Sequence, residues 1–449
     1  MAFSIKIVQF LITVIQFIVG LLIIVGIHEL GHLLLAKLFN MRVNNYIIGF
    51  PPKIFKFKFG ETEYALGAVP LGGAVQIAGM VDESLDENNL ADTPQPWEFR
   101  SKPAWQRLIV ILGGIIFNLL SGIIIYIGLA YAIGSYCLPK NEVNTYGIMP
   151  YGIGIEMGFK EGDKIVKING KDFNNFYNIF APNILLSDKS YYTIQRDNQE
   201  LDIPIPSNFI DRLSENKTKN HIFVEPIYLC IMDIISPNST VDQAGLVSGD
   251  QIVELDNQPA LYRHQLVQIA ENCSNKTVQI AYLRKGTKMI SSIQLDNIGQ
   301  RLDAMLLKPA PEIVKYSFLQ SIPVGLNQAA LIIGSQALGI WKLITGKISV
   351  SKSLGGPISI AKSFGSEFIW SKFWLQVANL SIVIALMNLI PLPALDGGHA
   401  LFILYEMLLR RKPSERFLQT AQKMGMILLL FIMLYAFGND IRKILVALL

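Results

Sequence analysis

The sequence predicts a polytopic α-helical membrane protein with four transmembrane helices and a β-rich region inserted between the second and the third. Of its 449 residues, 51% are hydrophobic and only 16% are charged, whereas soluble proteins carry about 25% charged residues. Four long apolar runs supply the helices, and an internal repeat supplies the β-rich region. This composition excludes disordered, collagen-like and disulfide-stapled classes of protein.

The apolar runs are candidate membrane helices, because about 20 apolar residues cross roughly 30 Å of hydrocarbon. The first run lacks an evident small-residue cleavage site and continues into a polar motif, so we interpret it as a retained helix and not a signal peptide. The runs cover residues 7–27, 108–133, 373–395 and 425–437.

A further apolar stretch, 322–344, is interrupted at helical spacing by Asn327, Gln328, Gln336 and Lys342. This pattern favours an amphipathic helix that lies at the membrane interface. A fifth span at this place would also reverse the direction of the third run.

The short connections between the first two runs and between the last two are rich in Lys and Arg. Short positively charged loops stay in the cytoplasm, so both connections are predicted to be cytoplasmic. Both chain ends and the middle segment, about 135–370, are then expected outside the cytoplasm.

The middle segment contains an internal repeat. Residues 161–170, EGDKIVKING, recur about 87 positions later as residues 248–257, SGDQIVELDN. Each copy is typical of a tight Gly-Asp turn, a short strand and a second turn. Recurrence in register favours two related modules, which look like tandem PDZ domains, over two unrelated hairpins.

The strongest chemical motif is His28-Glu29-Leu30-Gly31-His32 at the end of the first run. Residues four apart share one face of a helix, so His28 and His32 can bind one zinc ion. Glu29 is then placed to take a proton from metal-bound water. Ionisable residues inside a membrane are costly, which marks this cluster as a functional site.

A catalytic zinc site requires a third protein ligand. Asp396 and His399 both follow the third run, and their spacing does not decide between them. Pro391 and Pro393 interrupt the helix just before Asp396 and free backbone groups that lipid cannot satisfy. We therefore expect a water-accessible pocket inside the membrane.

Other classes of function fit less well. Cys137, Cys230 and Cys273 show no C-x-x-C spacing, so a metal site must use His and carboxylates. No Lys/Arg block with interleaved aromatics indicates nucleic acid as a partner. A peptide-binding membrane scaffold would leave the ligand set unexplained, and a metal transporter would leave Glu29 unexplained.

Together these motifs resemble the site-2 proteases, which are zinc intramembrane metalloproteases, and specifically their bacterial regulator-of-sigma-E protease group with tandem PDZ domains. The similarity covers nearly the whole chain. Its motifs are the two Gly-Asp turns and residues 28–32 (HELGH), 70–73 (PLGG), 96–103 (PWEFRSKP), 354–358 (LGGPI) and 388–399 (NLIPLPALDGGH).

The resemblance implies that His28, His32 and Asp396 bind Zn²⁺ and that Glu29 is the general base. It also implies that Asn388 helps to hold unwound substrate, with an ordinary helix-packing asparagine as the alternative.

The segment 62–80 resembles a membrane-associated β-hairpin of the family, in which Gly72 and Gly73 bind substrate backbone by β-augmentation. An ordinary cytoplasmic hairpin is the alternative. The second run lacks a proline that the family shows near Asn118, so we assign Asn118 to packing.

The implied enzyme is a zinc endopeptidase of the bacterial inner membrane that cleaves transmembrane segments of single-span proteins, such as anti-sigma factors or remnant signal peptides. Its PDZ modules would lie in the periplasm and contact a peptide or substrate ectodomain. Its zinc site would lie near the cytoplasmic side of the lipid bilayer. The predicted segments are helix 1 with HExxH (1–38), a hairpin and loop (39–104), helix 2 (105–135), two PDZ-like domains (140–225 and 226–308), the amphipathic helix and loop (309–371), helix 3 with LDGG (372–400) and helix 4 (422–448).

Overall fold

The computed structural model divides into two compact units, Met1–Gly134 with Lys315–Leu449 (unit 1) and Ser135–Val314 (unit 2). Leu354 of the expected 354–358 motif lies outside the described residues. The structure describes all residues except 1, 81–92, 216–221, 234, 236, 238, 274–275, 296–305, 307–308, 310, 354 and 449.

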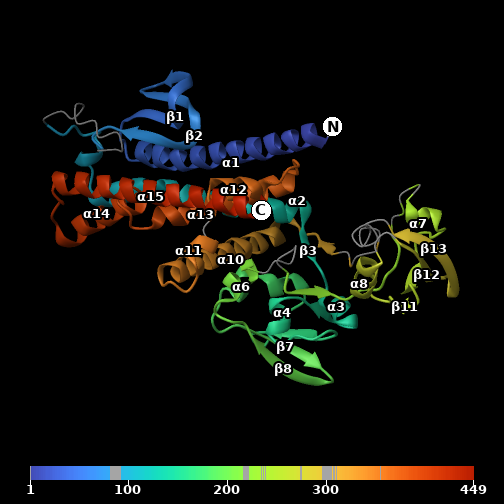
Figure 1. Cartoon of the computed structure of the whole chain (residues 1–449). Helices are drawn as coiled ribbons and strands as arrows, with labels where there is room; N and C mark the ends of the chain where they lie inside the picture. The colour runs from blue at the N-terminus through green and yellow to red at the C-terminus, as the bar shows by residue number, and fades with distance from the viewer. Residues whose placement is uncertain are drawn as a thin grey trace. The chain divides into compact units, whose positions relative to one another are not determined.

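Unit 1 is a helical bundle with one small sheet (Figure 1). Four of its helices are long and apolar enough to cross a membrane, at Ile7–Leu38, Ala104–Ile133, Trp370–Leu389 and Arg416–Lys443, which confirms the predicted number. The elements are α1 (Ala2–Leu38), β1 (Val43–Phe59), β2 (Thr62–Ile77), η2 (Phe99–Ser101), α2 (Ala104–Ile133), α10 (Phe318–Ile344), α11 (Val350–Ser353), α12 (Pro357–Phe364), α13 (Trp370–Leu389), α14 (Asp396–Leu409) and α15 (Glu415–Leu448).

Helix α2 packs against α1, α10, α13 and α14. It approaches α1 most closely where glycines meet: a Cβ added to Gly31 would lie 2.3 Å from the carbonyl oxygen of Gly113. Small residues allow such backbone contact between membrane helices. An ion pair of 2.6 Å between Arg107 and Glu406 joins α2 to α14. The first two helices and α14 are therefore fixed together beside the HExxH motif.

The third predicted segment, 372–400, consists of two helices. Helix α13 ends at Leu389 and a separate helix, α14, begins at Asp396, which confirms the interruption expected at Pro391 and Pro393. Pro391 and Pro393 occupy the break, where they remove two backbone donors that a continuous helix would need. The break places Asp396 at the start of a helix instead of inside one.

Helix α10 covers the stretch for which we predicted an amphipathic helix. It packs lengthwise on α2 and α13 through small residues: a Cβ added to Gly325 would lie 2.5 Å from the backbone nitrogen of Ile127, and Ala329 is buried with Tyr126, Ala378 and Ile382. The face that carries Gly325 and Ala329 is thus a helix-packing face.

Strands β1 and β2 form a sheet in which the first half of β1 is central. Residues 45–48 have register partners on both sides, in residues 73–76 and in residues 63–66. The second half of β1 pairs with Thr62–Gly67. The end of β2, Gly72–Ile77, is therefore paired on one side only among the described residues and forms an edge of the sheet.

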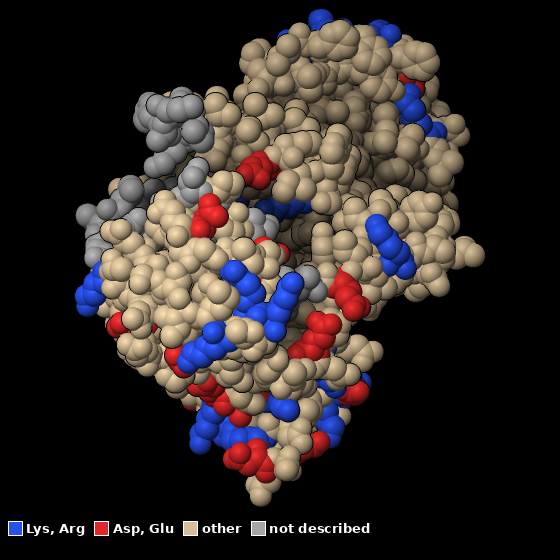
Figure 2. Space-filling view, turned by 90° about the vertical axis from the view of Figure 1, so that its right-hand side faces the viewer, with Lys and Arg blue, Asp and Glu red and all other residues tan. Residues whose placement is uncertain are grey.

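Unit 2 is rich in short strands (Figure 1). Figure 2 shows acidic and basic side chains interspersed over it, in contrast to long stretches of uncharged surface elsewhere. Its elements are β3 (Ser135–Cys137), α3 (Lys140–Tyr146), β4 (Ile148–Pro150), α4 (Ile153–Glu156), β5 (Lys164–Ile168), β6 (Lys171–Asp172), η3 (Phe176–Phe180), α5 (Pro182–Leu185), β7 (Tyr191–Arg196), β8 (Gln199–Pro204), α6 (Phe209–Glu215), β9 (Val224–Pro226), α7 (Thr240–Gln243), β10 (Gln251–Leu255), β11 (Gln258–Pro259), α8 (Arg263–Asn272), β12 (Lys276–Arg284), β13 (Thr287–Leu295) and β14 (Glu312–Val314).

The sequence repeat is a structural repeat. Its two four-stranded sheets have matching orders, β6-β5-β7-β8 and β11-β10-β12-β13, and each surrounds its own hydrophobic core. The second turn has positive φ at both central positions in each copy, at Asn169-Gly170 and at Asp256-Asn257, as a two-residue hairpin requires.

Each repeat is closed by the same buried ion pair. Asp163 accepts two hydrogen bonds from Arg196, of 2.7 and 2.6 Å, and Asp250 accepts two from Arg284, of 2.9 and 2.7 Å. Both carboxylates are 1% exposed, and each also accepts a 2.8 Å bond from a backbone N–H. The Asp of the Gly-Asp turn therefore locks the turn to the third strand of its sheet.

Candidate metal centre

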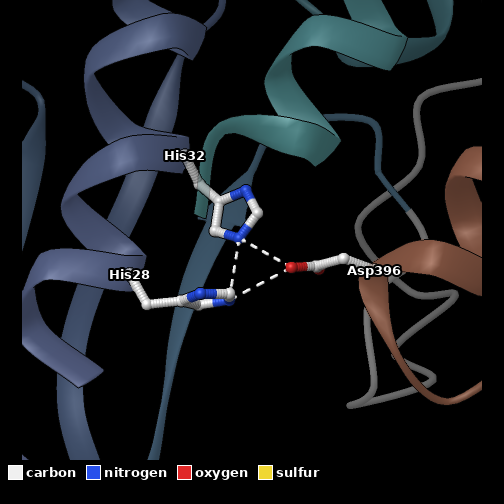
Figure 3. A group of neighbouring side chains, drawn as sticks. All are labelled: His28, His32 and Asp396. Atoms are coloured by element: carbon white, nitrogen blue, oxygen red, sulfur yellow. Dashed lines mark hydrogen bonds and ion pairs between the residues drawn. The ribbon is translucent and has the colours of Figure 1, made fainter. Parts of the chain in front are cut away.

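The two histidines of the HExxH motif lie on the α1 face that meets α2 and the start of α14. His28 and His32 are one helical turn apart, and their Nε2 atoms are 3.3 Å from each other. Asp396 reaches the same point from the first turn of α14 (Figure 3). Three side chains from two distant parts of the sequence thus converge.

The three ligand atoms form a nearly equilateral triangle. Asp396 Oδ2 lies 3.1 Å from His28 Nε2 and 3.4 Å from His32 Nε2. With bonds of about 2.1 Å, neighbouring ligands of a tetrahedral zinc ion are about 3.4 Å apart. The triangle therefore has the size that zinc requires and leaves a fourth position for water or substrate.

The hydrogen bonding of Asp396 also fits a metal site. Asp396 Oδ2 is buried, and no hydrogen-bond partner satisfies it within the described part of the chain. A buried carboxylate oxygen left in this way is costly unless a cation occupies the site. His399 is not part of the cluster of metal-ligating groups, so the geometry favours Asp396 where spacing left both residues open.

Helix α2 orients His32. The Nδ1 atom of His32 lies 2.9 Å from the carbonyl oxygen of Val110. A carbonyl only accepts hydrogen bonds, so Nδ1 carries the proton and Nε2 presents its lone pair to the centre of the triangle. Val110 could not be identified from the sequence, because a backbone carbonyl has no side-chain signature.

Two asparagines flank His28. Asn118 is fully buried and its side-chain amide lies 3.4 Å from His28 Nδ1, while the Asn388 amide lies 3.5 Å from His28 Nε2. Asn118 Oδ1 has no hydrogen-bond partner among the described residues. Amide oxygen and nitrogen are interchangeable by a flip, which would let Oδ1 accept the Nδ1 proton of His28. The structure thus places Asn118 against His28, a contact that our assignment to packing did not anticipate.

Gly114 makes room for both imidazoles. A Cβ at this position would lie 2.4 Å from His28 Cε1 and 2.5 Å from His32 Nε2. Any side chain here would push α2 away from α1 and separate Val110 and Asn118 from the histidines. Gly114 is thus a second site residue that the sequence analysis did not identify.

Glu29 lies on the side of α1 that faces the sheet. It is 8% exposed, and a Cβ added to Gly73 would lie 2.8 Å from Glu29 Cγ. The hydroxyl of Tyr46 donates a 2.7 Å hydrogen bond to the carbonyl oxygen of Gly26. The end of β2 therefore runs directly past Glu29. The Tyr46 hydrogen bond fixes the position of the sheet along α1. Gly72 instead packs against the Phe50 ring.

Comparison with known proteins agrees with this geometry. The chain matches the model of peptidase family M50 over residues 16–432. It is 28% identical to the regulator of sigma E protease of Haemophilus influenzae over 457 residues, which is 96% of this chain and 98% of the relative. It is 26% identical to the regulator of sigma E protease of Salmonella typhimurium over 456 residues, with 95% and 98% covered. The chain therefore belongs to peptidase family M50, the site-2 protease family of zinc metalloendopeptidases.

Proposed function

We propose that His28, His32 and Asp396 hold the zinc ion and that the enzyme cleaves peptide bonds inside the transmembrane segments of single-span membrane proteins. The observation that carries this proposal is the triangle of ligand atoms, with edges of 3.1, 3.3 and 3.4 Å. When bound, zinc supplies Lewis-acid polarisation of water and of the scissile carbonyl.

The residues around the triangle divide the remaining work. Glu29 takes a proton from the attacking water and returns it to the leaving amine, as a general base and then a general acid. Asp396 and the two neutral imidazoles together bring one negative charge to the zinc ion. Val110 and Asn118 hold the imidazole tautomers that direct both Nε2 atoms inward.

The substrate helix must unwind before it can react, because its backbone groups are hydrogen-bonded internally. The edge Gly72–Ile77 supports this step: its unpaired side can take an extended segment by β-augmentation. The contact between Gly73 and Glu29 places that segment beside the general base. Asn388, at the end of α13, can bind a freed carbonyl or amide of the same segment.

The test is cleavage of a single-span substrate by purified wild type and Glu29→Gln. We expect Glu29→Gln to bind zinc normally and to lose at least about 100-fold in turnover, the scale for removal of a general base. Glu142→Gln, a matched change at an exposed site of unit 2, should cleave normally. Near wild-type turnover by Glu29→Gln would refute the mechanism.

We further propose that the two repeats of unit 2 are PDZ modules on the outer side of a bacterial inner membrane, with the zinc site near the cytoplasmic side. The Lys/Arg-rich short loops support this orientation. Cysteine labelling in intact cells is the test. In a variant whose native cysteines are replaced, Lys189→Cys in unit 2 should react with an impermeant reagent, whereas Lys412→Cys between α14 and α15 should be protected. The reverse pattern would overturn the orientation.

The modules are expected to act as a steric filter that excludes substrates with bulky outer domains. The relatives named regulator of sigma E protease support an anti-sigma type of substrate, and remnant signal peptides are the other candidate class. Deletion of about 145–308 should let untrimmed substrates be cut without changing zinc content. Slower cleavage of the trimmed substrate would instead favour recruitment of a peptide by the modules.

A further inference from the structure

The second half of β1, Lys53–Phe59, is an edge strand that the proposed chemistry does not use. It pairs with Thr62–Gly67 on one side, and no strand in the described part of the chain pairs with its other side. All seven of its residues are exposed. We call these seven residues the outer edge of the sheet.

One face of the outer edge is aromatic. Phe55, Phe57 and Phe59 alternate along the strand and so share a face; their exposed fractions are 59%, 52% and 74%. The ring centroids of Phe55 and Phe57 are 5.8 Å apart, and Phe57 stacks on Tyr64 at 5.2 Å. Contiguous exposed aromatic surface of this kind marks an interaction site.

The aromatic row begins at a membrane-spanning helix. Tyr64 lies 5.6 Å from Tyr46, measured between ring centroids, and the Tyr46 hydroxyl is bonded to Gly26 of α1. Gly26 lies well inside the candidate span Ile7–Leu38. The row therefore starts beside a part of α1 that a bilayer would surround, and exposed aromatic rings are typical of the membrane interface.

The opposite face of the outer edge carries positive charge. Lys56 and Lys58 project there, and neither has an ion-pair partner among the described residues. Glu63, the register partner of Lys58, pairs instead with Lys53. The nearby acid Glu61 is 3.8 Å from Lys37 of α1. Glu63 also attracts Lys56 and Lys58 electrostatically. One carboxylate thus faces three lysines, which leaves a net positive charge behind the aromatic row.

We propose that the outer edge is a docking surface for anionic phospholipids, with its phenylalanines in the apolar layer and Lys56 and Lys58 on the headgroups. An aromatic face backed by lysines matches the layering of a leaflet, because lysine stems extend through the apolar boundary while the ammonium stays at the headgroups. The lipid would hold the sheet from its outer side while α1 holds it from the inner side.

The experiment uses the full chain with the photoreactive residue p-benzoylphenylalanine in place of Phe57. The protein is placed in nanodiscs of phosphatidylcholine with about 20% phosphatidylglycerol, irradiated, and analysed by mass spectrometry for lipid adducts. A lysine near an anionic surface contributes an attraction equivalent to about fivefold in partition. We expect the ratio of phosphatidylglycerol to phosphatidylcholine adducts to exceed the ratio of these lipids in the bilayer by about that factor.

The double variant Lys56→Gln/Lys58→Gln should reduce phosphatidylglycerol in the adducts to its share of the bilayer. Lys412→Gln/Lys423→Gln removes the same charge at exposed sites of unit 1 and should leave the enrichment unchanged. Zinc content checks that all variants are folded. Absence of lipid adducts, adducts that simply mirror the bilayer, or an enrichment that survives Lys56→Gln/Lys58→Gln would each overturn the proposal.

Discussion

Buried carboxylates in the two units have opposite surroundings. Asp250 in unit 2 is bound by Arg284 and by a backbone N–H, and Asp163 repeats the arrangement with Arg196. Asp396 in unit 1 faces two imidazole nitrogens and keeps a buried oxygen without a hydrogen bond in the described part of the chain. A buried carboxylate whose oxygens are all hydrogen-bonded stabilises a fold. A carboxylate that keeps a buried oxygen without a hydrogen bond is suited to bind a cation.

The largest expected effect separates Asp396 from His399. Asp396→Ala removes one of three ligands, so we expect zinc to be lost and cleavage abolished. His399→Ala should keep about one zinc per chain, as measured by mass spectrometry of the purified protein. Loss of zinc from His399→Ala together with retention in Asp396→Ala would reverse the assignment.

Asn118→Leu tests the contact behind the proposed zinc ligand His28. The change keeps a similar volume but removes the only side chain with which α2 contacts His28 Nδ1 in the described structure. We expect zinc affinity to fall about tenfold, the lower end for loss of a partner behind a metal ligand. Asn327→Leu, at an exposed position of α10, is the matched control in a chelator competition. Equal affinities for the two variants would return Asn118 to packing.

Arg284→Ala tests the buried ion pair of the second repeat in unit 2. It leaves Asp250 buried with only its backbone donor, so the melting temperature of unit 2 should fall. Zinc binding and cleavage of a trimmed substrate should be unchanged, because no ligand lies in unit 2. Hydrogen exchange measures the thermal unfolding of unit 2, and the zinc content is measured on the same protein. A drop in zinc content would contradict the separation of the two kinds of site.

Acid should weaken the same ion pair. Burial alone would raise the pKa of Asp250, but the hydrogen bonds from Arg284 and Val247 outweigh it and hold the pKa below the ordinary value of 3.8. A depressed folded pKa gives stability that is present above pH 3.8 and is lost as the pH falls through the folded value. Unit 2 should therefore unfold more easily below that pH, and Arg284→Ala should flatten this dependence. A pH dependence that is identical in wild type and variant would exclude Asp250 as its source.

The smallest effect concerns the register of the sheet on α1. Tyr46→Phe removes the bond to Gly26 and should raise KM for a membrane substrate about fivefold, with kcat and zinc content nearly unchanged, since one neutral hydrogen bond contributes about 1 kcal/mol. Tyr64→Phe, the register neighbour of Tyr46, is the control. A fall in kcat instead of a rise in KM would indicate a role for Tyr46 in the chemistry.

Features that depend on short-range spacing could be predicted from the sequence alone. Hydrophobic runs of membrane length predicted the four candidate spans, the separation of four residues placed His28 and His32 on one face, and recurrence in register identified the repeat. Helix geometry and hydrocarbon thickness are fixed, so these features need no knowledge of distant contacts.

Features that depend on how distant segments meet needed the folded structure. It favoured Asp396 over His399 and brought Val110, Gly114 and Asn118 to the histidines. Spacing along the chain could not decide these points, because they depend on the crossing of α1 with α2 and on the turn that starts α14. The physical reason is that glycine contacts and buried hydrogen bonds, which have no sequence period, set the distance between helices.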